Sequence, residues 1–131
     1  MPDHQLLSVR VLVVDDSPDT REIVVEMLEH HGATVTGVGT AEEALDALEA
    51  SRPDVILSDL EMPAKDGYWL IGRVRALPPD RGGLTPAACL TGRTEPEARA
   101  RVLKAGFQYH IAKPVDMSRL IGIVGILALK P

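Results

Sequence analysis

The sequence predicts an α/β domain of the doubly wound type, with a five-stranded parallel sheet between two layers of helices. Short apolar runs rich in β-branched residues recur along the chain, and each is followed by a segment with apolar residues at helical spacing. The connections between these segments are short, so successive strands are expected to run parallel with right-handed crossovers. No low-complexity segment or long linker interrupts this alternation, so one domain is expected to fill the chain.

Each predicted strand is a short apolar run bounded by turn or cap residues. The five predicted strands cover residues 11–14, 33–38, 55–57, 87–91 and 107–111. A helix is expected after each strand, and the starts are marked by residues that cap helices. The predicted helices run from Ser17 and Pro18 to Gly32, from Thr40 to before Pro53, from after Asp66 to Pro78, from Thr94 to near Gly106, and from Asp116 or Ser118 through Leu129.

Composition excludes several classes of function. A chain of 131 residues is one domain's length, so residues 1–131 are expected to form one unit with its core at about 9–129. The net charge of -5 and the lack of a basic run argue against nucleic-acid binding. No secretory signal is evident at the N-terminus, so the expected location is the cytoplasm, without membrane contact. Cys89 has no partner for a disulfide or a zinc site, and a buried small hydrophobe is expected there.

Polar residues that carry chemistry occur where the predicted strands end. Asp15 and Asp16 follow the first strand, Asp59 the third, Thr91 ends the fourth, and Lys113 follows the fifth. Ligands of open parallel sheets bind at these carboxyl ends, so the five side chains are expected to converge. Each residue alone has a plainer explanation, such as a helix cap or a strand residue. Together they imply strong repulsion, since two carboxylates about 4 Å apart repel by roughly 4 kcal/mol at an effective dielectric constant near 20.

A divalent cation would relieve this repulsion. An open site made of oxygen ligands suits Mg²⁺, which usually binds one or two carboxylates together with phosphate oxygens. A carboxylate beside Mg²⁺ can act as the nucleophile of a phosphoryl transfer, with nearby positive charge and hydrogen-bond donors stabilising the phosphoryl oxygens. The common nucleotide-binding motifs GxxxxGK[ST] and GxGxxG are absent from the sequence. The residues therefore predict phosphoryl chemistry at a carboxylate, without a bound nucleotide.

In order and spacing, four segments resemble the receiver domains of response regulators. They are VLVVDD at 11–16, SDLEMPAKDG at 58–67, LTG at 90–92 and AKP at 112–114. The resemblance implies a flavodoxin-like (βα)₅ fold with strand order 2-1-3-4-5. It also implies a signalling domain that takes a phosphoryl group from a histidine kinase or phosphotransfer protein, and that catalyses its own phosphorylation and dephosphorylation without converting an external substrate. The segment GFQYHIAKPVD is similar to the receiver modules of hybrid histidine kinases.

The resemblance also implies a role for each site residue. Asp59 is the expected phosphoacceptor, with Mg²⁺ bound by Asp16, Asp59 and the backbone carbonyl of Glu61, and by Asp15 through water. Lys113 is expected to pair with the phosphoryl group, and the Lys113–Pro114 peptide bond is expected to be cis. The Thr91 hydroxyl is the expected switch that moves to the phosphoryl oxygen. Loop residues Met62, Pro63 and Gly67 are expected to shape the site without reacting.

Two positions depart from the commonest receiver pattern. His110 stands where receivers often have Tyr or Phe, so it is either a modified switch element or a histidine that packs or stays solvated. Tyr109 is expected to point to the opposite face of the strand. Gly92 and then Arg93 follow Thr91, where alanine commonly follows the threonine, and this would leave the phosphoryl group more open.

Two other functions are compatible with parts of this pattern. A phosphatase of the haloacid dehalogenase type also uses an aspartyl nucleophile and Mg²⁺, but it needs D-x-D after the first strand, and this chain has Asp15, Asp16 and Ser17. The other alternative is a receiver-like fold kept only as an interaction scaffold. Output is expected through protein contact. The uncharged run 120–129 is either simply core, with Gly122 and Gly125 on its outer face, or an interface for homodimerisation or docking on a partner domain through the fourth helix, fifth strand and fifth helix, and the interface is favoured.

Overall fold

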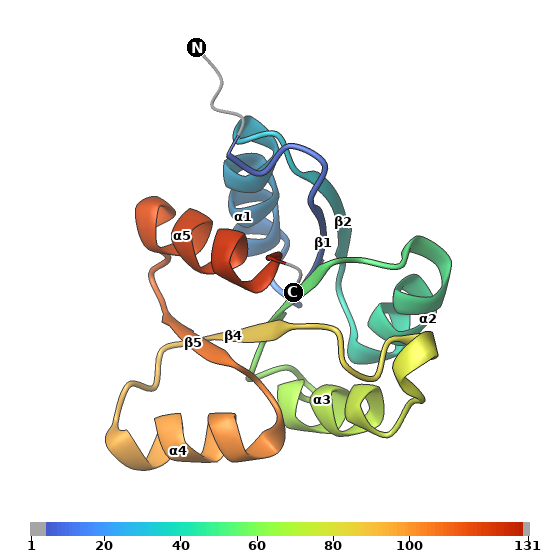
Figure 1. Cartoon of the computed structure of the whole chain (residues 1–131). Coiled ribbons are helices and arrows are strands. Elements are labelled where there is room, and N and C mark those ends of the chain that lie inside the picture. The colour runs from blue at the N-terminus through green and yellow to red at the C-terminus, as the bar shows by residue number, and fades with distance from the viewer. Residues whose placement is uncertain (1–4, 130–131) are drawn as a thin grey trace.

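The computed structural model describes residues 5–129 and confirms the predicted alternation of strands and helices (Figure 1). The strands are β1 (Arg10–Val14), β2 (Thr34–Val38), β3 (Val55–Asp59), β4 (Ala87–Thr91) and β5 (Tyr109–Ala112). The helices are α1 (Pro18–His30), α2 (Ala41–Ser51), α3 (Gly67–Arg75), α4 (Pro96–Ala105) and α5 (Met117–Leu127), with a short 3₁₀ helix at Pro79–Arg81. All strand pairs are parallel and their order is β2-β1-β3-β4-β5, the predicted flavodoxin-like arrangement.

Two apolar cores lie on the two faces of the sheet, because successive side chains of a strand point in opposite directions. On β1, Val11 and Val13 pack into the core that α1 and α5 cover. Leu12 and Val14 pack into the core that α2, α3 and α4 cover. Strands β3 and β4 are buried along their whole length, as expected for central strands of a parallel sheet.

Several predicted helix starts are confirmed by cap hydrogen bonds. Ser17 Oγ accepts from the backbone N–H of Thr20, with Pro18 in the first helical turn. Thr40 Oγ1 accepts from the N–H of Glu43, 3.1 Å away. Asp116, one of the two predicted caps of α5, accepts from a backbone N–H in the first turn of that helix. The sequence signals for these ends are local, which explains why they could be read from the chain.

The predicted start of the fourth helix at Thr94 is wrong. The helix begins at Pro96, and Glu95 before it has the extended conformation that a following proline imposes. The predicted fifth strand also begins too early: the N–H of Phe107 bonds to the carbonyl of Val102, so Phe107 closes α4 instead of entering β5. At the other end, α5 stops at Leu127, two residues before the predicted end.

The apolar run in α5 packs mostly into the core, as the first of its two interpretations has it. Its large residues are mostly buried: Leu120, Ile121, Ile123, Val124 and Leu127. Leu6, from the segment before β1, is also buried in this core, and its backbone N–H bonds to the carbonyl of His31 at the end of α1. Gly125 faces Leu6 closely, since an added Cβ would lie 4.0 Å from the leucine Cδ2. The run is therefore mainly core, although Ile126 remains exposed.

Candidate functional site

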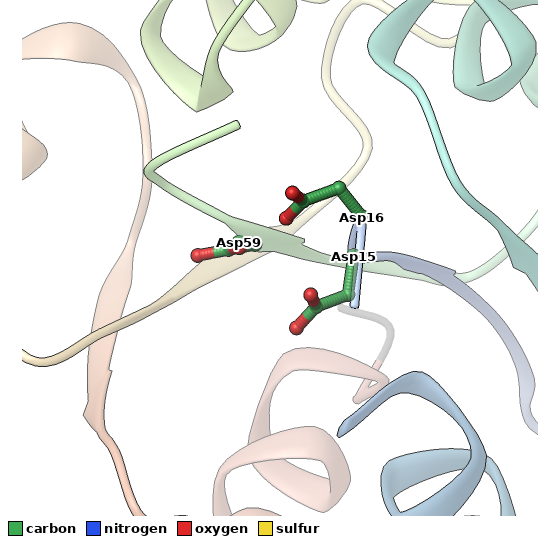
Figure 2. Close-up of side chains that lie close together, drawn as sticks. All are labelled: Asp15, Asp16 and Asp59. Atoms are coloured by element: carbon green, nitrogen blue, oxygen red, sulfur yellow. The ribbon is translucent and has the colours of Figure 1, made fainter. Parts of the chain in front are cut away.

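Three carboxylates meet at the carboxyl edge of the sheet. Asp15 and Asp16 follow β1, and Asp59 is the last residue of β3. One oxygen from each of the three lies within 4.8 Å of the others, and Figure 2 shows the side chains projecting from adjacent strand ends. The parallel register explains the meeting, because Val14 pairs with Ser58 and the next residues, Asp15 and Asp59, therefore come side by side. Asp15 and Asp59 are buried, whereas Asp16 is exposed.

Lys113 contacts two of these acids. Its Nζ lies 3.3 Å from Asp15 Oδ2 and 3.3 Å from Asp59 Oδ1. The lysine is placed by its backbone N–H, which bonds to the carbonyl of Thr91, and the Lys113–Pro114 bond is cis as predicted. Burial lowers the pKa of Lys113, but Asp59 and Asp15 raise it more, so its net pKa lies above the ordinary value. The ammonium group therefore stays charged beside the carboxylates.

Asp59 has a strongly perturbed carboxyl group. Its pKa is raised from 3.8 to about 6, first by burial and then by the charge of Asp15, while Lys113 acts in the opposite direction. The backbone N–H of Glu61 donates a 3.3 Å bond to Asp59 Oδ1. One ammonium cannot neutralise three carboxylates, so the site carries excess negative charge that a hard cation with oxygen ligands would balance.

Asp15 is held more tightly than the other two acids. Its Oδ1 accepts from the N–H of Ser17 at 2.9 Å, and its Oδ2 contacts Lys113. Its backbone carbonyl accepts from Arg21 Nη1 at 2.7 Å. Both carboxylate oxygens thus already have protein partners, an arrangement that suits contact with a cation through water rather than direct ligation.

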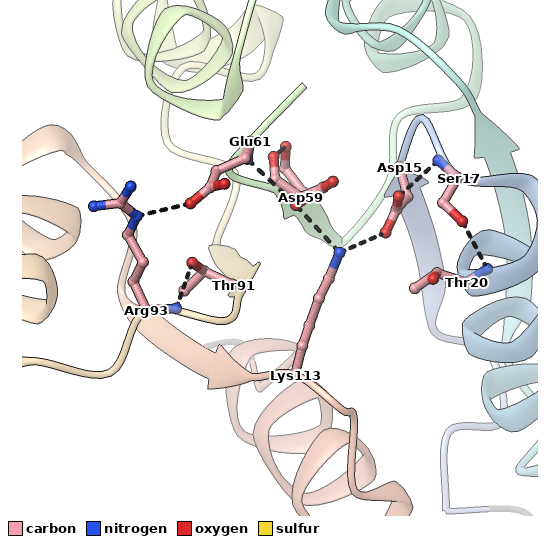
Figure 3. Close-up of polar contacts among 9 residues, drawn as sticks. Asp15, Ser17, Thr20, Asp59, Glu61, Thr91, Arg93 and Lys113 are labelled. Atoms are coloured by element: carbon pink, nitrogen blue, oxygen red, sulfur yellow. Dashed lines mark hydrogen bonds and ion pairs between the residues drawn. The ribbon is translucent and has the colours of Figure 1, made fainter. Parts of the chain in front are cut away.

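Thr91 and Glu61 lie on the other side of Asp59 from Asp15 (Figure 3). Thr91 is buried, and its Oγ1 accepts from the backbone N–H of Arg93 at 3.1 Å. The Glu61 carboxylate pairs with Arg93 Nε at 2.8 Å. The five predicted side chains therefore do converge, together with the backbone of Glu61. The Glu61–Arg93 ion pair was not predicted, since nothing in the local sequence pairs residues that lie 32 positions apart.

His110 is buried, and its Nε2 lies 2.7 Å from the backbone carbonyl of Arg93. A carbonyl oxygen only accepts, so Nε2 carries the proton of this bond. The histidine is therefore packed and bonded to the loop after Thr91, and the alternative in which it stays solvated is wrong. Tyr109 packs against the core under α1 and α5, on the opposite face as predicted.

Gly67 brings the start of α3 against the end of β3. Its N–H bonds to the carbonyl of Leu60 at 2.9 Å. A Cβ at this position would lie 2.7 Å from the backbone oxygen of Asp59, a distance that real Cβ atoms do not adopt. The close approach requires glycine and fixes both ends of the loop 61–66.

Cys89 is fully buried in β4, as predicted, and burial raises the pKa of its thiol to about 12. Among residues 5–129, none of the helices has the length and apolar character needed to cross a membrane.

Comparison with known proteins places this site in a family. A sequence profile of the response regulator receiver domain matches residues 11–125. An uncharacterized 14.6 kDa protein of Leptolyngbya boryana is 46% identical over 119 residues, which are 91% of this chain and 89% of that protein. The sensory/regulatory protein RpfC of Xanthomonas campestris is 32% identical over 122 residues, 93% of this chain but 17% of the relative.

Solved structures agree with the sequence comparisons. The chemotaxis protein CheY4 of Vibrio cholerae matches with a TM-score of 0.84 at 30% identity, covering 91% of this chain and 98% of that one. The receiver domain of the sensor histidine kinase PA1611 of Pseudomonas aeruginosa matches with a TM-score of 0.82 at 30% identity, covering 92% and 97%, and it has a magnesium ion coordinated in its active-site cleft. This chain therefore belongs to the response regulator receiver domain family of two-component signalling.

Proposed function

We propose that this receiver domain accepts a phosphoryl group on Asp59 from the phosphohistidine of a histidine kinase or phosphotransfer protein. The observation that carries the proposal is a buried carboxylate, in contact with Lys113, at the centre of an acidic cluster. In the reaction an Asp59 oxygen attacks phosphorus, the P–N bond to the donor histidine breaks, and the imidazole leaves with the electron pair. Above a pH of about 6 the carboxylate is mostly ionised and ready for this attack.

The acidic cluster fits a magnesium ion by its chemistry, because its donors are oxygen atoms and its charge is unbalanced. We assign Asp16, Asp59 and the backbone carbonyl of Glu61 as ligands and Asp15 as a contact through water. The bound ion would supply positive charge next to the phosphoryl oxygens. Lys113 holds the Asp59 carboxylate in place and then neutralises an oxygen of the transferred group.

Thr91 is the proposed switch residue. Its Oγ1 accepts from the N–H of Arg93, which leaves the hydroxyl proton free to be donated to a phosphoryl oxygen. A movement of Thr91 toward Asp59 would alter this bond and so reach the loop that His110 also holds. We therefore assign Thr91 and His110 to the switch.

The proposed domain turns over no external metabolite. Hydrolysis of the aspartyl phosphate returns Asp59 and releases inorganic phosphate, and the output is a change in protein contacts. Residues 1–131 act as one domain in this proposal. The homodimer or partner-domain contact through α4, β5 and α5 stays a prediction. Leu103 on α4 and Ile126 on α5 are exposed, whereas Ile123 is buried. Substitutions that test the contact therefore belong at Leu103 and Ile126.

Labelling with acetyl phosphate tests the proposal. We expect one phosphoryl group per chain, labile to acid and base, that depends on Mg²⁺ and is absent from Asp59→Ala. Mass spectrometry of the intact protein measures it. The matched control is Asp46→Asn, which changes an exposed acid on α2 away from the cluster. Undiminished labelling of Asp59→Ala would contradict the assignment, and no labelling of the wild type would favour the interaction scaffold.

A further inference from the structure

One cation at the site has no role in the proposed chemistry. Arg93 lies on the opposite side of Asp59 from Lys113 (Figure 3). In this structure its guanidinium Nε pairs with the Glu61 carboxylate at 2.8 Å. Glu61 is itself tied to the acceptor, since its backbone N–H donates to Asp59 Oδ1. The guanidinium group is thus bound to a carboxylate that lies next to the phosphorylation site.

The main chain of Arg93 is fixed at the site from two sides. Its N–H donates to Thr91 Oγ1 at 3.1 Å, and its carbonyl accepts from His110 Nε2 at 2.7 Å. Both bonds hold the Arg93 backbone beside Thr91 in this structure, and the bond from His110 does not depend on the position of the Thr91 side chain. The side chain itself has freedom to move, because 68% of its surface is exposed, and that of Glu61 is 63% exposed.

We propose that Arg93 exchanges ion-pair partners on phosphorylation. Its guanidinium group releases the Glu61 carboxylate and binds the phosphoryl group on Asp59. The inference rests on the proposed function and adds a residue that determines how firmly the modified state is held. An exposed ion pair such as Glu61–Arg93 contributes little to stability, so breaking it costs little. A phosphoryl group adds about -1.5 to -2 charge units and three acceptor oxygens, which a planar guanidinium binds through two parallel hydrogen bonds.

The exchange predicts that Arg93 and Glu61 have opposite effects on the stability of the phosphorylated state. Arg93 favours the phosphorylated state because it binds the phosphoryl oxygens. Glu61 opposes that state because it competes for the guanidinium and repels the new charge. A merely structural ion pair would behave differently, since loss of either partner would then change the site in the same direction.

Beryllofluoride, a mimic of the phosphoryl group on aspartate, provides the test when it is titrated with Mg²⁺ into the 131-residue protein. Calorimetry measures the dissociation constant for the wild type, Arg93→Met, Glu61→Gln and the double variant. We expect Arg93→Met to weaken binding by about fivefold, the upper end for an exposed ion pair. Glu61→Gln should tighten binding, because the Arg93 guanidinium is then free for the phosphoryl mimic. In the Arg93→Met background Glu61→Gln should tighten binding much less, because that protein has no guanidinium at position 93.

Arg99→Met is the matched control, because it removes the same charge from an exposed position on α4 and should leave binding unchanged. The exchange would be overturned if Arg93→Met and Glu61→Gln both weakened beryllofluoride binding. It would also be overturned if Glu61→Gln tightened binding equally in the wild type and in Arg93→Met. If the wild type binds no beryllofluoride, the proposed phosphoacceptor function fails instead. Binding by the wild type with no effect of Arg93→Met would overturn the exchange alone.

Discussion

Replacement of Asp59 by asparagine is expected to stabilise the metal-free protein at neutral pH. Asp59 is 5% exposed and lies beside Asp15, and its pKa is raised from 3.8 to about 6. Each unit of difference between the folded and unfolded pKa corresponds to about 1.36 kcal/mol, so ionised Asp59 costs up to about 3 kcal/mol of folding free energy. Because this pKa already includes the lowering effect of Lys113, we expect Asp59→Asn to gain about 2 to 3 kcal/mol.

The sign of the pH dependence follows from the raised pKa. Below the unfolded pKa of 3.8 the carboxyl group is protonated in both states and costs nothing. The cost grows as the pH rises through this value and is complete above the folded pKa of about 6. The advantage of Asp59→Asn should therefore be largest at neutral pH and should shrink as the pH falls.

Urea unfolding followed by circular dichroism, in the presence of EDTA, measures this difference. At about pH 7.5 the full effect is expected, and at about pH 4.5 most of it should be gone. Asp46→Asn on the exposed side of α2 is the control and should show no such pH dependence. Equal or lower stability of Asp59→Asn at about pH 7.5, or a gain that does not change with pH, would refute the reasoning.

Three further predictions concern the metal, a half-buried arginine and the single cysteine. Mg²⁺ at 100 times its dissociation constant should stabilise the wild type by about 2.7 kcal/mol, and Asp16→Ala should lose most of this response in thermal unfolding; an unchanged response would contradict the assigned ligands. Arg75 donates to the carbonyls of Gly83, Thr85 and Gly106, so Arg75→Met should lower the free energy of unfolding by about 2 to 3 kcal/mol. Urea titration measures it, and Arg75→Lys should restore little, because one ammonium cannot reach all three carbonyls; a fully stable lysine variant would argue against this role. Cys89 is buried with a thiol pKa of about 12, so iodoacetamide should label it only after unfolding, whereas rapid labelling of the native protein would show that the strand opens.

Much of the site could be predicted because its residues follow strands, and strands are marked locally. Once β1 and β3 are recognised as neighbouring parallel strands, the register brings Asp15 and Asp59 together. The cap at Ser17 is equally local, whereas the cis bond before Pro114 was expected from the family resemblance, because most X-Pro bonds are trans. The start of α4 was predicted wrongly because two local signals compete there. The capping pattern favours Thr94, but Pro96 holds the residue before it in an extended conformation, so the helix begins at Pro96.

The contacts that could not be predicted join distant parts of the chain. Arg75 binds the carbonyl of Gly106, 31 positions away, and this contact exists only because α3 and the end of α4 pack together. The burial of α5 depends in the same way on Leu6, which comes from the opposite end of the sequence. A hydrophobic run shows that a helix needs cover, but it does not say which segment provides it.

The close contact between Gly67 and the backbone of Asp59 also has a consequence for how this loop can vary. The chain leaves the end of β3 after Leu60 and returns to the same place at Gly67, so the intervening loop 61–66 is closed at its base. Met62 packs into the core and Asp66 caps α3, so variation is tolerated at the exposed positions Pro63 and Ala64, where a change extends into solvent without displacing the ends of the loop. The exposed surface beside Asp59 can therefore vary while the Asp59 carboxylate keeps its position, provided that residue 67 carries no side chain.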